Sequence, residues 1–188
     1  METNIKNHIA ADLCNRCGLY VGTYHKYNCG SLAGAWLDME TFDTAEEFFA
    51  VCRELHADEH DPEFMLQDYT GIPECLYGES MGAAEIENII EYANLTDEEQ
   101  WMFDAYDKVE GFVGKKMSVD EFLSEAKDCC MGEFNTFEDF ANQLADETIE
   151  AYQDKIPEFF TLYFDYEAHA RSMRGYYSSM NGYVFMKK

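Results

Sequence analysis

Negative charge is concentrated in one long central part of this 188-residue chain. Residues 38–168 contain 36 acidic and six basic residues, a net charge of −30, whereas residues 1–37 sum to +1 and residues 169–188 to +4. Self-repulsion destabilises a compact fold with such a charge, and the solubility of a small domain needs a net charge of only about 2–8. We therefore expect surface carboxylates that are maintained for a purpose other than solubility.

The apolar content indicates that this acidic chain folds. Hydrophobic residues make up 47% of the sequence and aromatic residues 15%, which is enough for several small cores. Disordered acidic tails lack such content. Adaptation to high salt also gives acidic proteins, but those chains usually shed large apolar residues, and this one has kept them.

The charge is comparable with that of duplex DNA. B-DNA carries about two negative charges per base pair, so the 36 carboxylates match about 18 base pairs. A symmetric dimer would match about twice that length. The natural complement is a partner with a long basic groove. Direct binding to nucleic acid is disfavoured, because the central field would repel phosphates.

Residues 18–72 are predicted to form a small α+β domain. Leu19–His25 and Ala33–Asp38 have strand composition and flank a turn-rich stretch, which indicates a β-hairpin. A capping box that starts at Thr44 begins a helix, and Met65–Tyr69 suits a third strand. The predicted inner face of the helix consists of Ala45, Phe48, Phe49, Cys52 and Leu55.

Residues 73–128 are predicted to form an all-helical middle domain that follows a linker containing Gly and Pro. Ala83–Ala93 has isoleucines at helical spacing, and capping boxes at Thr96 and Ser118 begin two further helices. The predicted inner residues are Ile86, Ile89, Ile90, Trp101, Ala105, Val109, Val119, Phe122, Leu123 and Ala126.

A short motif indicates a second α+β domain at residues 129–188. Phe42–Phe48 and Phe134–Phe140 both fit F-[DN]-T-x-E-[DE]-F, and Asp68–Tyr69 parallels Asp165–Tyr166 further on. Other predicted elements are a helix stripe at Phe137, Phe140, Ala141 and Leu144, a helical stretch at Phe159–Arg171 and a strand at Gly182–Met186. The predicted fold class is α+β, with α+β end modules flanking a helical middle domain and residues 1–17 as an N-terminal extension.

The outer faces of the predicted helices are acidic. On a single helix such a face is usually only solvated, but here the excess runs through every predicted helix. We therefore expect these carboxylates to bind a basic partner. The candidate contact residues are Glu46, Glu47, Glu54, Glu85, Glu87, Glu91, Glu98, Glu99, Asp107, Asp120, Glu121, Glu125, Glu138, Asp139, Asp146 and Glu147.

The residues give no good case for an enzyme, a cofactor or a metal site. The sequence contains no G-x-S-x-G, H-E-x-x-H, P-loop or Rossmann fingerprint, and no EF-hand loop. Cys14 and Cys17 form a C-x-x-C that, with His25 and Cys29, has the residue types of a zinc knuckle. A strong zinc signal has two such pairs, so free thiols are the preferred interpretation.

Two histidines near the end of the first predicted helix are also interpreted as structural. His56 and His60 lie four residues apart. We expect both in a solvated C-terminal turn, where the helix dipole favours the cationic form.

Cysteine usage favours a reducing compartment. Seven cysteines, an odd number that includes adjacent Cys129 and Cys130, suit a protein with free thiols. The first residues lack the basic and apolar regions of a signal peptide, and no apolar run is long enough to span a membrane. We expect a cytoplasmic protein.

Three stretches of the chain match motifs of one known family. Tyr27–Trp36 fits Y-N-x-G-x-L-x-G-x-W, Gln67–Pro73 contains an Asp-Tyr pair, and Pro157–Arg171 contains D-Y-x-A-x-x-R. In this order they make the chain resemble the ArdA antirestriction proteins, which plasmids, transposons and phages carry. The resemblance runs from about Leu19 to Met186 and leaves residues 1–17 outside.

The resemblance implies a function and an assembly. ArdA proteins are elongated homodimers of three small domains per chain, with carboxylates arranged like DNA phosphates, and they block type I restriction–modification enzymes at the DNA-binding groove of the specificity and methylation subunits. The family's antirestriction motif falls on about residues 152–166, near the dimer interface. Carried over, the interface and motif residues are Phe160, Tyr163, Asp165, Tyr166, Ala170 and Arg171, for each of which a place in the core is the alternative.

Two other functions are compatible with the residues. One is an acidic binding module for another DNA-binding or defence protein, which a pull-down from host lysate would identify. The other is a divalent-cation buffer or metal-dependent enzyme, for which calorimetry would detect tight stoichiometric binding of Ca²⁺, Mg²⁺ or Zn²⁺.

Overall fold

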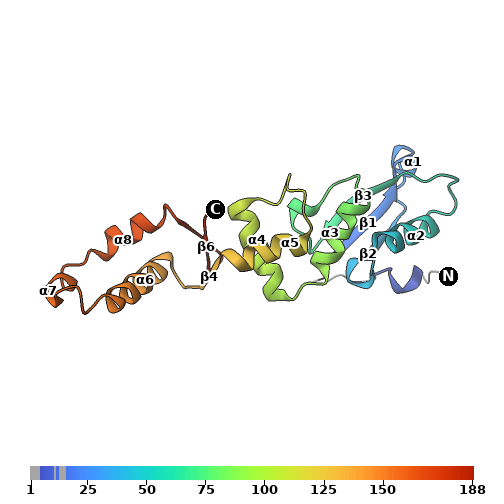
Figure 1. Ribbon diagram of the computed structural model, residues 1–188. Coiled ribbons are helices and arrows are strands. Elements are labelled where there is room, and N and C mark those ends of the chain that lie inside the picture. The colour runs from blue at the N-terminus through green and yellow to red at the C-terminus, as the bar shows by residue number, and fades with distance from the viewer. Residues whose placement is uncertain (1–4, 11, 13–15) are drawn as a thin grey trace. The chain divides into compact units, whose positions relative to one another are not determined.

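The chain adopts an α+β fold in two compact units. The computed structural model describes residues 5–10, 12 and 16–188 (Figure 1). Unit 1 consists of Met1–Gln100 and Phe112–Glu121, and unit 2 of Trp101–Gly111 and Phe122–Lys188. The helices expected in a middle domain are thus divided between the units. The division into three domains stays a prediction.

Unit 1 contains the predicted three-stranded sheet. Its strands are β1 (Gly18–Thr23), β2 (Ala35–Asp38) and β3 (Phe64–Thr70), in the order β2-β1-β3 and all antiparallel. Leu19 and Val21 of β1 are fully buried, so this strand carries the centre of the core. The three predicted strands are confirmed.

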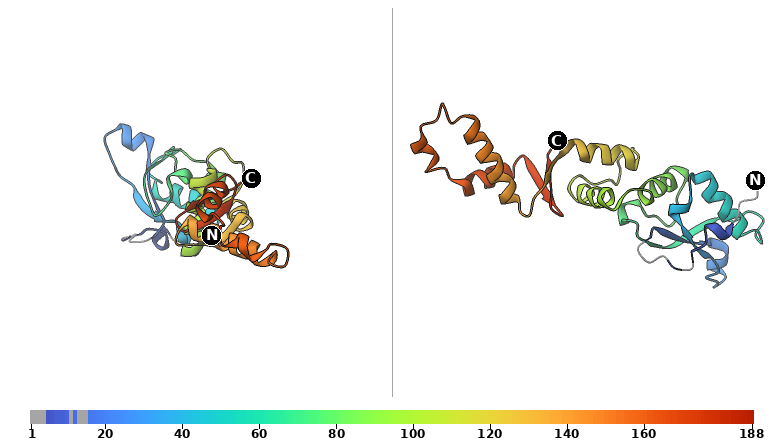
Figure 2. Two further views of the ribbon diagram at one scale, coloured as in Figure 1. Left: turned by 90° about the vertical axis from the view of Figure 1, so that its left-hand side faces the viewer. Right: turned by 90° about the horizontal axis from the view of Figure 1, so that it is seen from below.

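The first strand ends earlier than predicted, because helix α1 (Tyr24–Asn28) begins inside the expected strand. The Thr23 hydroxyl accepts a hydrogen bond from the backbone N–H of Lys26 at 3.2 Å, as an N-cap does. This local cap outweighs the strand propensity of Tyr24, so the extension of the strand to His25 is wrong. The α1 segment extends away from the sheet (Figures 1 and 2).

Helix α2 (Ala45–Leu55) begins at the predicted cap. The Thr44 hydroxyl accepts from the N–H of Glu47 at 3.2 Å, while the Glu47 carboxylate accepts from the N–H of Asp43 at 3.1 Å, one residue before the usual capping-box position. Ala45, Phe48, Val51 and Cys52 are buried, and Phe49 and Leu55 are half-buried.

Three longer helices follow the predicted linker, which contains the short 3₁₀ helix η3 (Glu74–Leu76). They are α3 (Ala83–Ala93), α4 (Asp97–Glu110) and α5 (Val119–Cys129). Reciprocal hydrogen bonds between Thr96 and Glu99, and between Ser118 and Glu121, confirm both predicted capping boxes. Buried residues confirm the predicted inner faces of α3 and α5: Ile86, Ile89, Ile90, Val119, Phe122, Leu123 and Ala126.

The inner face of α4 differs from the prediction. Trp101 is 62% exposed, whereas Phe103, Ala105 and Tyr106 are buried. The Tyr106 ring lies 4.8 Å from the Phe122 ring and 5.1 Å from the Phe185 ring, between centroids. Of the predicted stripe, Ala105 is buried and Val109 half-buried, so the prediction is wrong for Trp101. Periodicity alone did not show that Phe103 and Tyr106 also face the core.

Unit 2 contains a second antiparallel sheet, with strands β4 (Cys130–Glu133), β5 (Tyr177–Met180) and β6 (Tyr183–Met186) in the order β4-β6-β5. Helices α6 (Phe137–Ala151) and α8 (Tyr166–Met173) lie beside each other, and α7 (Glu158–Thr161) lies at the end of unit 2 away from the sheet (Figures 1 and 2). The core contains Phe137, Phe140, Ala141, Ala170 and Val184.

Strands β4 and β5 of this sheet were not predicted, although a clear turn signal lies between β5 and β6. Met180 pairs with Tyr183, so Asn181-Gly182 forms the two-residue loop of the β5–β6 hairpin. Both loop residues have positive φ, 52° and 88°, which Asn-Gly adopts readily in such a turn.

The predicted helical stretch Phe159–Arg171 is two short helices, not one. Helix α7 ends at Thr161, and Asp165 caps the start of α8 by accepting from the N–H of Ala168 at 2.8 Å. The repeat holds only in its first half. Thr44 and Thr136 both cap helices, but Asp68–Tyr69 lies on a strand whereas Asp165–Tyr166 begins a helix.

The described part of the N-terminal extension packs against β2. Ile9 forms a β-bridge with Leu37, and the N–H of Asp38 donates to the carbonyl of His8 at 2.9 Å. The buried His8 ring stacks on Phe42 with centroids 4.3 Å apart.

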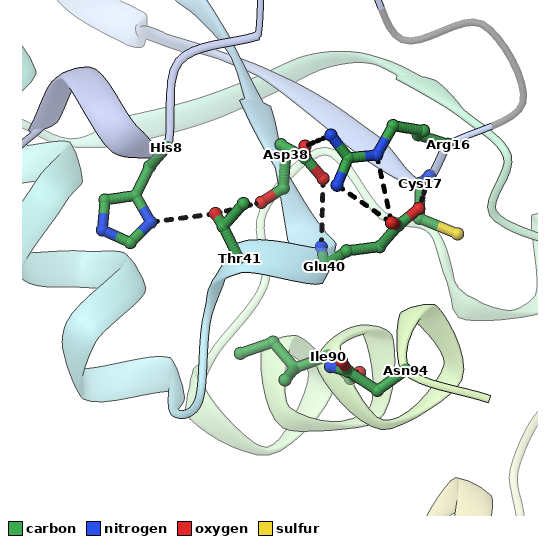
Figure 3. A network of polar contacts seen from close by, with 8 residues as sticks. All are labelled: His8, Arg16, Cys17, Asp38, Glu40, Thr41, Ile90 and Asn94. Carbon is green, nitrogen blue, oxygen red and sulfur yellow. Dashed lines mark hydrogen bonds and ion pairs between the residues drawn. The ribbon is translucent and has the colours of Figure 1, made fainter.

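An ionic clamp holds the end of the extension (Figure 3). The Arg16 guanidinium forms an ion pair with the buried carboxylate of Asp38 and donates two hydrogen bonds of 3.0 Å to Glu40. Burial raises the pKa of Asp38, and Arg16 opposes this shift. The extension is thus anchored to the sheet at both His8 and Arg16.

Candidate functional surface

The sixteen predicted contact carboxylates all lie at the surface. Ten are exposed and six are half-buried. The half-buried residues are Glu47, Glu87, Glu91, Glu99, Asp107 and Glu125. Amphipathic periodicity therefore placed all of them on outer faces, as a large charge requires.

Several of these carboxylates begin their own helices. A carboxylate near a helix N-terminus accepts from backbone N–H groups that have no partner inside the helix, and it is favoured by the helix dipole. The residues that do this at or just before their own helix are Glu47, Glu85, Glu99, Glu121 and Asp139.

Helix α3 caps the starts of two other helices, and both starts lie in unit 1. Glu87 accepts from the N–H of Ala45 at the start of α2, at 2.8 Å. Asn88 and Glu91 accept from the N–H groups of Val119 and Asp120 at the start of α5, at 3.3 and 3.2 Å. Sequence reasoning missed these contacts, because 29–42 residues separate the partners.

Other carboxylates are neutralised by side chains of unit 2. Glu125 pairs with Lys188 and Glu138 with Arg174, each at 2.7 Å. The hydrogen bond from Arg174 lowers the pKa of Glu138. Exposed pairs of this kind contribute little to stability, but they reduce the charge available to a partner.

Four of the predicted carboxylates remain open. Among the described residues, no side-chain hydrogen bond or ion pair is recorded for Glu46, Glu54, Glu98 and Asp120, and all four are exposed. They are the members of the set best placed to meet a basic partner.

Exposed aromatic side chains gather at α7 and the loop after it. Phe160 is 63% and Tyr163 73% exposed, beside the equally exposed Phe159 and Leu162. The Phe159 and Tyr163 ring centroids lie 5.0 Å apart. Isolated exposed apolar side chains are normal on a protein surface, whereas a group of them is typical of interaction sites.

The other four residues of the predicted motif make contacts inside unit 2. Asp165 caps α8, the Tyr166 hydroxyl donates to the carboxylate of Asp146, and Ala170 lies in the core. Arg171 lies 3.7 Å from Glu167 on the same helix. Phe160 and Tyr163 differ from these four, because their ring contacts are with the exposed Phe159 of the same segment.

A polar cluster around the buried side chain of His56 was not predicted. His56 is 1% exposed. Its Nδ1 accepts from the Lys26 ammonium at 2.9 Å, and its Nε2 donates to the carbonyl of Val21 at 3.3 Å. Burial and the neighbouring Lys26 charge lower the pKa of His56. The prediction of a solvated, cationic His56 is therefore wrong, whereas His60 is exposed as expected.

This cluster has the residue types of a metal site but holds its own cation. His56, Asp58 and Glu59 offer ligand atoms within 4.8 Å of one another. The Lys26 ammonium lies 2.9 Å from Asp58 and 3.5 Å from Glu59, so it forms ion pairs with both carboxylates and offsets one of their two negative charges. Of the four zinc-knuckle candidates, Cys14 lies outside the described residues, and the buried Cys17 thiol donates to the carbonyl of Gly71 at 3.0 Å.

Comparison with known proteins identifies a family. The model of a family described as "Antirestriction protein (ArdA)" matches residues 19–185. A search of curated proteins found no match. Across the described residues, no helix has both the length and the apolar character needed to cross a membrane.

Proposed function

The chain belongs to the ArdA family of antirestriction proteins, and we propose that it inhibits type I restriction–modification enzymes by imitating double-stranded B-DNA. The observation that carries this proposal is the surface position of all sixteen predicted carboxylates in a segment with a net charge of −30. A non-catalytic inhibitor of this kind needs no cofactor.

The proposed mechanism is competition for the DNA-binding groove. The carboxylates meet the basic side chains of the specificity and methylation subunits, which otherwise bind phosphates. Phosphate contacts supply nearly all the affinity for non-specific DNA, so no base edges need to be copied. Because ions screen the attraction, affinity falls as salt rises.

We also propose that the protein acts as a homodimer in the cytoplasm of a bacterial host. The exposed aromatic residues around Phe160 and Tyr163 support a self-complementary contact. The division into domains at 18–72, 73–128 and 129–188 is part of the same proposal, because it places an α+β domain with the aromatic segment at the dimer interface.

A competition experiment tests the proposal. A purified type I restriction–modification enzyme is mixed with labelled target duplex and increasing amounts of this protein, at low and at high salt. We expect displacement near one dimer per enzyme at low salt and weaker displacement at high salt. Folded protein that displaces no duplex even in large excess would rule out DNA mimicry and direct the search to other basic partners, through pull-down from host lysate.

A further inference from the structure

Helix α3 has an apolar face that is buried in unit 1 and a polar face that contacts the starts of two other helices. Ile86, Ile89 and Ile90 on its inner face are buried. Its polar side chains Glu87, Asn88 and Glu91 contact the backbones of two other helices. These three residues are therefore not simply part of a solvated acidic face.

The contacts satisfy backbone groups that helix geometry leaves open. The first N–H groups of a helix have no partner inside it. At α5, Ser118 and Glu121 cap each other locally, and α3 supplies acceptors for the next two N–H groups through Asn88 and Glu91. At α2, the Thr44 hydroxyl accepts a hydrogen bond from the N–H of Glu47. The Glu87 carboxylate of α3 accepts one from the N–H of Ala45.

These contacts fix where two sets of surface carboxylates lie. Glu46 and Glu47 occupy the first turn of α2, and Asp120 and Glu121 the first turn of α5. Glu87 and Glu91 are four residues apart on one helix, so they are neighbours on its surface at a fixed spacing. The starts of α2 and α5 are thus held to a common rigid element.

We propose that Glu87, Asn88 and Glu91 are positioning residues, which set the spacing of the carboxylates in the first turns of α2 and α5 and do not themselves meet the partner as charges. This inference rests on the proposed function, because it states how a charge pattern is held in place. It differs from a uniform acidic surface, in which every carboxylate acts only through its charge.

Paired substitutions separate positioning from charge. Glu87→Gln and Glu91→Gln remove the charge but keep an oxygen that accepts the backbone hydrogen bond, whereas Glu87→Ala and Glu91→Ala remove both. Glu74→Gln and Glu74→Ala form the matched control, because Glu74 is an exposed carboxylate of unit 1 outside the sixteen predicted contact residues. Thermal unfolding of each variant verifies the fold before binding is measured.

Amide hydrogen exchange reads out the helix starts without any partner. We expect Glu87→Ala to speed exchange at the N–H of Ala45 and Glu91→Ala to speed it at the N–H of Asp120, with the glutamine variants close to wild type. Equal exchange in the alanine and glutamine variants would overturn the capping role.

Displacement of labelled duplex from the restriction–modification enzyme reads out the consequence. We expect both Glu74 variants to match wild type and both glutamine variants to stay within about fivefold of it, the upper range for one exposed ion pair. Both alanine variants at Glu87 and Glu91 should lose more than that. Equal losses for alanine and glutamine would assign these residues as contact charges. A wild-type protein that displaces no duplex overturns the proposed function instead, and amide exchange then decides the capping role alone.

Discussion

The Tyr166 hydroxyl at the start of α8 donates a hydrogen bond to the Asp146 carboxylate on α6. The hydrogen bond raises the pKa of Tyr166, because loss of the proton would place two negative charges side by side. On the inner side of the same two helices, Ala141 and Ala170 are packed in the core. The polar pair therefore ties α8 to α6 at the surface, next to the exposed aromatic segment.

Replacing Tyr166 with Phe removes this tie and keeps the ring. We expect faster amide exchange in α8 and a slightly lower midpoint of thermal unfolding, because an exposed hydrogen bond contributes little to stability. Tyr163→Phe is the matched control, since Tyr163 is an exposed tyrosine for whose hydroxyl no partner is recorded. Identical exchange in the two variants would mean that the Tyr166–Asp146 contact does not restrain α8.

His56 gives the stability of unit 1 a pH dependence of known sign. Its folded pKa is lowered by burial and by Lys26, whereas the pKa of an unfolded histidine is about 6.5. Below that pH the unfolded chain binds the proton more readily, so stability is greatest above it and falls as the pH drops toward the folded pKa. Urea unfolding between pH 8 and pH 5 measures the slope.

The control for this experiment is a histidine substitution outside the cluster. We expect His56→Gln to flatten the loss of stability below neutral pH, and His60→Gln, at an exposed position, to leave it as in wild type. Taking differences from wild type cancels the contribution of the many carboxylates. If stability falls with pH as steeply in His56→Gln as in wild type, the folded pKa of His56 is not lowered.

Local signals predicted the elements that local interactions create. The capping boxes at Thr96 and Ser118 involve partners three residues apart, so sequence alone contains both halves. The isoleucine stripe of α3 is similarly local. On α4 the predicted stripe was correct for Ala105 but not for Trp101, because Tyr106 packs against Phe122 and Phe185 in unit 2 while Trp101 is exposed.

Contacts between distant segments could not be predicted in this way. The pair Lys26–His56 joins residues 30 apart, and Glu87–Ala45 joins residues 42 apart. Helical periodicity placed each carboxylate on an outer face, but it did not show which carboxylates cap a neighbouring helix. The Asn181-Gly182 turn is a different case, because its signal is local and the sequence alone contains it.

The Arg16–Asp38 ion pair leads to a prediction about stability. Removing Arg16 alone should lower the free energy of unfolding more than removing both charges of the pair. Arg16→Met leaves the buried Asp38 carboxylate without its counter-ion, and an unpaired buried charge is strongly destabilising. We expect Arg16→Met to unfold at lower urea than the double variant Arg16→Met with Asp38→Asn. A double variant less stable than Arg16→Met alone would contradict this assignment. Limited proteolysis after Lys6 reports whether the extension has detached.

The aromatic segment predicts a dimer that charge can disrupt. Phe160→Asp places a charge among the exposed aromatic residues of α7, so we expect the sedimentation coefficient to fall to that of a monomer, with the fold retained. Leu32→Asp is the control, because Leu32 is 67% exposed in unit 1, close to the 63% of Phe160. A dimer that survives Phe160→Asp would place the self-contact elsewhere.

The open carboxylates predict a distributed response to substitution. Glu46→Gln, Glu54→Gln, Glu98→Gln and Asp120→Asn should each weaken displacement of duplex by less than about fivefold, because an exposed ion pair contributes about 0–1 kcal/mol. The four together should weaken it by more than any single change and make it less sensitive to salt, since fewer charges remain to be screened. A single exposed substitution that abolishes displacement would point to one specific contact, and so would a quadruple variant with unchanged salt sensitivity. Either result would replace DNA mimicry spread over the surface with recognition at one site.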